Sequence, residues 1–423
     1  MSLGFEQAGF DVKAAVEIDP VHCSVHAFNF PECAVLPESV SSLTGADLLT
    51  AANTDRVDVV FGGAPCQGFS MIGKRLLDDP RNALVRDFVR LVRETEAGWF
   101  VFENVKGLTV GSHRRFLLEL YEEFDQAGYA VRAPWQVLNA KNFGTPQSRE
   151  RLILLGAKKG NQLPNYPFPT HGAIGGIADY LVAPSPTCKE ALDDLPDAEC
   201  FTELQNCDKV AIPEWGEPSS YASEMRCLNP RDWHFGYRRS WNPALMTSSI
   251  RTTHSSISRR RFAETLPGEV EPISRFFRLS PDGVSNTLRA GTDGARGAFT
   301  SPRPIHYRYA RCITVREMAR LHGFPDWFRL HVTKWHGARQ VGNAVPPPLA
   351  RAIATEVMKA MGVSPVRPSR MIPLGAEELL RFDLSQAAAY WEVDRPASKR
   401  DRKSGAKKRK QEEIERLRMG ART

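Results

Sequence analysis

The sequence predicts an α/β protein with a parallel, doubly wound sheet and an irregular domain of strands and loops inserted after it. Two observations favour this fold class. In residues 1–163, short apolar runs alternate with stretches of helical periodicity, the order expected when each strand is followed by a helix that packs on the sheet. In residues 164–310, Pro, Ser, Gly and Arg dominate and the helical period disappears. This second part is therefore expected to be mostly β-strand and loop.

The individual elements follow from the same patterns. Apolar runs predict four strands, at residues 12–18, 57–61, 99–102 and 152–155. Helical patterns lie between them at residues 84–92 and 116–127, and Gly128 is expected to close the second helix. Regular apolar and helical patterns return at residues 313–324 and 340–361. In the second range, a helix should start after three prolines and end at Gly362. We therefore expect residues 311–362 to rejoin the first domain.

The end of the chain has a different composition. Residues 363–373 are rich in proline and predict a linker, and residues 376–391 predict a short helical extension. The tail from residue 399 holds 11 Lys and Arg against 4 acidic residues, which predicts disorder in isolation. Residues 226–316 hold 16 arginines, no lysine and 6 acidic residues. These two basic segments indicate a polyanionic partner, with the arginines on a binding face.

Composition also argues against several protein classes. No apolar run approaches the ~18 residues of a membrane span, and the N-terminus lacks a secretory signal, so we expect a cytoplasmic protein. We also expect this protein to be a monomer. The eight cysteines include no CxxC pair, which predicts reduced thiols rather than disulfides or a zinc site. His22, Cys23 and His26 fall on one turn without a further ligand at matching spacing. We interpret the histidines as surface residues and predict no metal site.

The stretch DVVFGGAPCQGFS, residues 58–70, carries the first candidate for chemistry. Its apolar run stops at Gly-Gly-Ala-Pro, and Cys66 follows. The thiol is thus expected just beyond the carboxyl end of a strand, where open α/β sheets place their active sites. For an isolated cysteine, a small buried thiol is about as common an interpretation. The neighbouring motifs decide between the two.

These motifs resemble those of the DNA (cytosine-5)-methyltransferases, and they occur in the family's order. Pro-Cys-Gln at residues 65–67 resembles the nucleophile motif, Glu-Asn-Val at 103–105 the next, and Gln-Ser-Arg-Glu-Arg at 147–151 the third. The resemblance covers about residues 1–362. It implies a Rossmann-like, S-adenosylmethionine-dependent methyltransferase sheet with a target-recognition domain inserted at residues 164–310.

The resemblance implies a role for each motif. Cytosine C5 is a weak nucleophile, and a thiolate that adds to C6 activates it, so Cys66 would be the nucleophile. Glu103 would protonate or hydrogen-bond the ring at N3, although a locally satisfied helix-terminal carboxylate is the alternative. Arg151 would hold the cytosine O2 and Arg149 would brace the pocket, because alternate residues of an extended segment face one side. Strand-edge arginines paired with Glu150 are the alternative here.

S-adenosylmethionine is the implied cofactor. Glu17, followed by Ile18, matches the acidic position that holds the ribose hydroxyls. Asp47, followed by Leu48, matches the aspartate that holds the adenine amine. The other positions that match cofactor-proximal motifs are Pro65, Leu84, Asn343 and Val345.

One part of the family pattern is absent. The family begins with a strand and a glycine-rich loop, Asp-Leu-Phe-x-Gly-x-Gly-Gly, whereas residues 1–10 resemble the helix that follows this loop. Either the true start lies upstream of Met1 or the chain is truncated, and the intact downstream motifs favour the first. Because the loop would supply backbone N–H groups, the sequence as it stands is expected to bind the cofactor poorly.

The implied partner is double-stranded DNA. A restriction endonuclease acting on the same site would accompany the modification enzyme of a restriction–modification pair, whereas an orphan methylase would have none. Phosphate contacts would set affinity and base contacts specificity. The candidate DNA contacts, each with a solvated loop as the alternative, are Gln67, Ser70, Lys74, Arg251, Arg259, Arg260 and Arg289. Two further functions stay open. Methylation of a tRNA cytosine is disfavoured by the large insert, and non-catalytic DNA binding is disfavoured by the intact motifs.

Overall fold

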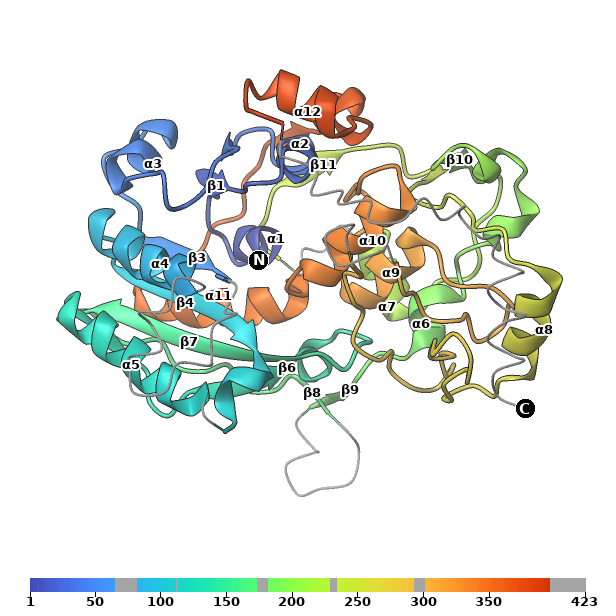
Figure 1. Ribbon diagram of the computed structural model, residues 1–423, viewed down its shortest axis with the longest axis horizontal. Helices are drawn as coiled ribbons and strands as arrows, with labels where there is room; N and C mark the ends of the chain where they lie inside the picture. Colours follow the sequence, from blue (N-terminus) through green and yellow to red (C-terminus); the bar gives the residue numbers. More distant parts are fainter. Residues whose placement is uncertain (65–81, 112, 173–181, 229–233, 293–300, 396–423) are drawn as a thin grey trace, which may run out of the picture.

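The computed structural model describes residues 1–64, 82–111, 113–172, 182–228, 234–292 and 301–395 (Figure 1). The predicted site residues Pro65, Cys66, Gln67, Ser70 and Lys74 lie outside these ranges. Within the ranges, no helix is both long enough and apolar enough to cross a bilayer.

The main sheet is mixed rather than wholly parallel. Its strands are β3 (Val59–Gly62), β4 (Trp99–Val105), β5 (Tyr129–Val131), β6 (Gln136–Asn139) and β7 (Glu150–Lys158). The order is β3-β4-β7-β5, and β6 also pairs with β7. β3 and β4 are parallel, whereas β7 runs antiparallel to β4, β5 and β6. The prediction of a parallel sheet is therefore wrong for β5, β6 and β7. β6 and β7 are joined by a short segment that contains the 3₁₀ turn η4 (Ala140–Phe143), and a connection this short suits an antiparallel pair.

Helices cover both faces of this sheet, which gives three layers (Figure 1). On one face, α4 (Ala83–Glu94) and α5 (His113–Gln126) pack on Phe100 and Phe102 of β4. On the other face, α1 (Ser2–Gln7) and α11 (Pro347–Ala360) pack on Val101. Alternate residues of β4 thus enter different cores, as the period of a strand requires.

A second, smaller unit contains the first predicted strand. In it, β1 (Ala14–Val16) and β2 (Ala34–Leu36) form a parallel pair joined by α2 (Pro20–Asn29), and α3 (Gly45–Ala51) follows. β1 is not a hydrogen-bonded neighbour of β3. The predicted strands at residues 12–18 and 57–61 are confirmed, but they lie in separate sheets.

The inserted domain is irregular as predicted, but the described part of it is not mostly β. Its strands have two or three residues each: β8 (His171–Gly172), β9 (Ala183–Pro184), β10 (Val210–Ala211), β11 (Arg238–Ser240) and β12 (Leu245–Met246). Its helices are α6 (Cys188–Leu192), α7 (Ser220–Met225) and α8 (Ser256–Glu264). Its core continues into α9 (Val315–His322), where Met318 packs with Leu192 and Met225. This core therefore crosses the boundary predicted at residue 310.

The arginine-rich segment is not a single basic face. Arg239 lies buried beside Glu6, with 2.7 Å between Nη2 and Oε2. Arg311 is buried against Glu317 at 2.8 Å. Arg316 is also buried and donates to the Thr247 hydroxyl at 2.7 Å. A buried charge needs a partner, so much of the segment's positive charge holds the domain together instead of facing solvent.

The last part of the chain packs back onto the protein. α10 (Lys334–Asn343) and α11 precede Gly362, whose φ is +70°. Beyond it, β13 (Met371–Pro373) pairs in parallel with β11 of the inserted domain. The 3₁₀ turn η9 (Glu377–Leu380) and α12 (Leu384–Tyr390) confirm the predicted helical extension and lie over α2 (Figure 1). The predicted linker thus contains a strand, which its local proline content did not indicate.

Candidate active site

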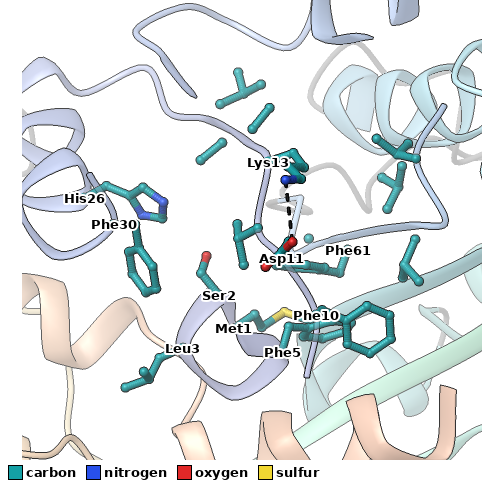
Figure 2. A pocket seen from close by; sticks show the side chains of 18 of the residues that line it. Met1, Ser2, Leu3, Phe5, Phe10, Asp11, Lys13, His26, Phe30 and Phe61 are labelled. Atoms are coloured by element: carbon teal, nitrogen blue, oxygen red, sulfur yellow. Dashed lines mark ion pairs between the residues drawn. The ribbon is translucent and has the colours of Figure 1, made fainter. Parts of the chain in front are cut away.

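A cavity of about 1260 Å³ separates β1 from β3 and reaches Glu103. Figure 2 shows Met1, Phe5 and Phe61 on one side of it and His26 on another. Small-molecule sites usually measure roughly 300–1,000 Å³. The cavity therefore has room for a cofactor of nucleotide size.

Glu103 is the acidic group at the inner end of this cavity. It lies near the end of β4, and Oε1 is 2.7 Å from Nε of Arg151 on the neighbouring strand β7. Its side chain is 15% exposed. Burial raises the pKa of Glu103 above its usual value, although the Arg151 guanidinium opposes this shift. A carboxyl group with a raised pKa is suited to donating a proton near neutral pH.

The end of β3 is held against this carboxyl group. A Cβ at Gly63 would lie 2.5 Å from Oε2 of Glu103, so a side chain at this position would displace the carboxylate from its place beside Arg151. Asn104 donates from Nδ2 to the carbonyl of Ala64 at 2.8 Å. Ala64 is two positions before Cys66 in the sequence. The positioning role of Asn104 was missed in the sequence, although its place next to Glu103 in the motif was a usable signal.

Arg149 ties three distant segments together. It is buried, and its guanidinium donates to the carbonyls of Leu288 at 3.0 Å and Gly342 at 2.8 Å. Burial, together with the charge of Arg151, lowers the pKa of Arg149 to about 9. These contacts join the start of β7 to Leu288 of the inserted domain and to the end of α10. Arg149 therefore braces these three segments against one another.

Gln147 makes a second connection to the inserted domain, which sequence reasoning missed. Its Oε1 accepts from the backbone N–H of Leu288 at 3.1 Å, and its Nε2 donates to the carbonyl of Leu321 at 3.3 Å. A Cβ at Gly342 would lie 2.3 Å from the backbone nitrogen of Ala290. The backbone at residues 288–290 is therefore packed directly against the catalytic domain.

Most of the described residues predicted to bind the cofactor line the cavity. These are Glu17, Leu48, Leu84, Asn343 and Val345. Gln340 also lines it, and its Nε2 is buried without a hydrogen-bond partner. Such an orphaned donor fits a polar ligand in this space.

The structure does not place Ile18 or Asp47 at the cavity. Ile18 is 65% exposed and is not among the lining residues. Asp47 completes a capping box at the start of α3, where its carboxylate accepts from the N–H of Thr44 at 2.8 Å. A carboxylate committed to a helix N-terminus is satisfied there, so the predicted adenine contact is not supported. Val40 and Leu48 line the cavity on this side instead.

The two histidines of α2 are not surface residues. His22 and His26 both line the cavity, and burial lowers the pKa of His26 to about 4. Among the described residues, no three metal-binding side chains come together.

Comparison with known proteins identifies the family. The profile described as "C-5 cytosine-specific DNA methylase" matches residues 1–359. The chain belongs to this family. It is a DNA (cytosine-5)-methyltransferase, and DNA is its substrate.

Relatives of this methyltransferase match over most of their length. The type II methyltransferase M.XorII of Xanthomonas oryzae pv. oryzae is 51% identical over 414 residues, covering 95% of this chain and 94% of the relative. M1.HphI of Haemophilus parahaemolyticus is 34% identical, covering 85% and 83%. A crystal structure of an E. coli prophage-encoded DNA modification methyltransferase is 31% identical, with a TM-score of 0.69 over 86% of this chain and 96% of that chain.

The four described arginines that were predicted to contact DNA have two kinds of surroundings. Arg251 donates from Nη1 to the carbonyl of Glu199 at 2.9 Å, and Arg259 pairs with the carboxylate of Glu199 at 3.1 Å. Both therefore have internal partners within the protein, and their contact with DNA stays a prediction. Arg260 and Arg289 are exposed and form no ion pair with a residue that the structure describes.

Proposed function

We propose that this methyltransferase moves a methyl group from S-adenosylmethionine to C5 of a cytosine flipped out of a specific double-stranded DNA site. Cys66 would bond to C6 during the reaction. The observation that carries the proposal is Glu103, which pairs with Arg151 and lines the cavity. The segment that leads to Cys66 is packed against Glu103 at Gly63.

The reaction divides among the chain's own groups. The Cys66 thiolate adds to C6 while Glu103 gives a proton to N3, which leaves an enamine with a nucleophilic C5. Arg151 holds the cytosine O2 and stabilises the charge that builds up on the ring. After methylation, N3 returns its proton to Glu103, and loss of the C5 proton to a base expels the Cys66 thiolate and restores the neutral aromatic ring. Bound S-adenosylmethionine supplies the electrophilic methyl group.

The cavity residues suit that cofactor. One carboxylate oxygen of Glu17 accepts from the N–H of Asp19 at 3.0 Å, and the other can accept from ribose hydroxyls. Leu48, Leu84 and Val345 supply apolar walls for an adenine ring. The unpartnered Nε2 of Gln340 supplies a buried donor.

The biological setting follows from the relatives. M.XorII and M1.HphI are both type II methyltransferases. We infer that this enzyme protects one DNA sequence within a restriction–modification system. A restriction endonuclease that cuts the same unmethylated sequence would then be its functional partner.

A methyl-transfer assay on DNA tests the proposed function. The protein is incubated with DNA of mixed sequence and methyl-labelled S-adenosylmethionine, and bisulfite sequencing maps the modified bases. We expect 5-methylcytosine within one short recurring sequence. Transfer RNA is the matched control substrate, and labelling of tRNA instead of DNA would contradict the proposal.

Arg289 is the described arginine with the strongest case for a DNA contact. The carbonyl of the preceding residue, Leu288, is held by Arg149, so the exposed Arg289 side chain projects from the catalytic side of the inserted domain. We expect Arg289→Ala to weaken specific DNA binding by roughly 5- to 100-fold, the usual range for a base-reading arginine. Fluorescence anisotropy with labelled DNA measures this change.

Arg259→Ala is the control, because its partner is Glu199. It should change DNA affinity by less than about twofold, as expected for a partly exposed ion pair. Equal losses of DNA affinity in the two variants would contradict a specific contact between Arg289 and the DNA.

A further inference from the structure

Residues 369–391, here called the C-terminal strap, cover the outer face of α2. Leu379 and Leu380 of the strap form a buried cluster with Val25 and Phe28 of the helix. The backbone N–H of Gly375 donates to the carbonyl of Phe28 at 2.8 Å. A Cβ at Gly375 would lie 2.8 Å from Cα of Phe28, so the two backbones are in direct contact.

The strap contacts α2 at its middle and just beyond its end. At the middle of the helix, Trp391 donates from Nε1 to the hydroxyl of Ser24 at 2.9 Å. Beyond its end, Arg370 and Glu32 form an ion pair. The strap therefore holds the helix at several points from its middle to its end.

The same strap is joined to the inserted domain. Residues 371–373 pair in parallel with residues 238–240 of β11. Glu377 is 2.6 Å from Nζ of Lys209 in the inserted domain and 3.4 Å from Nη1 of Arg329. Arg329 also clamps the end of α2, because its backbone N–H donates to Oδ1 of Asn29 at 2.9 Å. The strap thus connects α2 with the inserted domain.

Besides the strap, the unit that contains α2 is held by Arg239, which donates to the carbonyl of Asn29 at 3.3 Å, and by Arg90 of α4, which donates to the carbonyl of Leu43 at 2.8 Å. Among the strands that the structure describes, β1 and β2 pair only with each other, and the cavity separates β1 from β3. Glu17 ends the β1 segment, and Asp19 caps α2 by accepting from the N–H of Val21 at 3.0 Å. A shift of α2 would therefore move Glu17 across the cavity.

We propose that the C-terminal strap is a positioning element for cofactor binding, which fixes α2 and hence Glu17 relative to the inserted domain. This inference rests on the proposed binding of S-adenosylmethionine in the cavity. The strap residues touch neither the cofactor nor the reacting atoms, so their effect is on the affinity for the cofactor and not on the chemical step.

Two variants test this inference on the full chain. Leu380→Ala removes buried contacts with Phe28, and Gly375→Ala forces the strap away from α2 without removing any group. Both should raise the dissociation constant for S-adenosylhomocysteine, the demethylated cofactor, by about 5-fold, a usual size for mutations that alter coupling between sites. Calorimetric titration measures this constant. Hydrogen exchange should accelerate in residues 14–36 of both variants.

Leu120→Ala is the matched control, because Leu120 is as buried as Leu380 but lies on α5, in the core beneath the main sheet. It should lower the melting temperature comparably while leaving the dissociation constant and the exchange of residues 14–36 unchanged. Kinetics give a further readout: KM for the cofactor should rise in the strap variants while kcat stays within about twofold.

The outcomes separate this inference from the proposed function. If the unaltered protein binds no S-adenosylhomocysteine, this chain does not hold the cofactor, and the exchange of residues 14–36 still tests the strap. If the unaltered protein binds and the strap variants bind equally well, the positioning role is overturned. Unchanged exchange in residues 14–36 of both strap variants would overturn it as well.

Discussion

Replacing Cys66 by serine is expected to abolish methyl transfer. A thiol of ordinary pKa about 8.5 can be held as a thiolate, whereas an alcohol stays protonated near neutral pH and cannot add to C6. The measurement uses DNA that contains 5-fluorocytosine together with S-adenosylmethionine. Because fluorine at C5 cannot leave as a proton would, the covalent complex is trapped and migrates as one band in a denaturing gel.

The unaltered protein should form this complex and Cys66→Ser should not. Cys227→Ser is the control, because Cys227 is an exposed free thiol far along the chain in the inserted domain, and this variant should form the complex normally. A complex in Cys66→Ser would show that another residue is the nucleophile, and its absence in Cys227→Ser would show that the assay reports folding instead.

Glu103→Gln is expected to slow single-turnover methylation by at least about 100-fold, the usual contribution of a general acid. The amide keeps the shape of the side chain but cannot deliver a proton to N3. DNA affinity should change by less than about twofold, because rate and binding are affected separately when only the transition state loses a contact. Rapid quench kinetics and anisotropy measure the two quantities.

The same residue predicts a dependence on pH. Burial raises the pKa of Glu103, and the protonated form is the active one. The rate of the unaltered protein should therefore fall as the pH rises through this pKa, and Glu103→Gln should lack that decline.

Glu150→Gln is the matched control for Glu103→Gln. Its carboxylate pairs with Lys106 at 2.9 Å at the exposed start of β7. Its removal should leave the rate nearly unchanged. Near-normal turnover in Glu103→Gln would mean that another group protonates the ring.

Local patterns in the sequence were sufficient for the regular elements of the catalytic domain. The predicted helices at residues 84–92 and 116–127 correspond to α4 and α5, and the helix expected after three prolines is α11. Hydrophobic periodicity and end signals act within a few residues of each position, so the sequence alone reports them. The motif of Glu103 and Arg151 was likewise readable, because its residue types and order are contiguous in the chain.

Only the tertiary structure decided the contacts that join distant residues. It showed that β7 runs antiparallel to β4, that Asp47 caps α3, and that Arg239 and Arg311 are buried in ion pairs. It also showed residues 371–373, within a stretch that reads as a proline-rich linker, paired with β11. Each of these depends on which partner lies nearby after folding. A carboxylate or a guanidinium has the same local signature whether it faces a ligand, caps a helix or neutralises a buried charge, and its partner is chosen by packing across hundreds of residues.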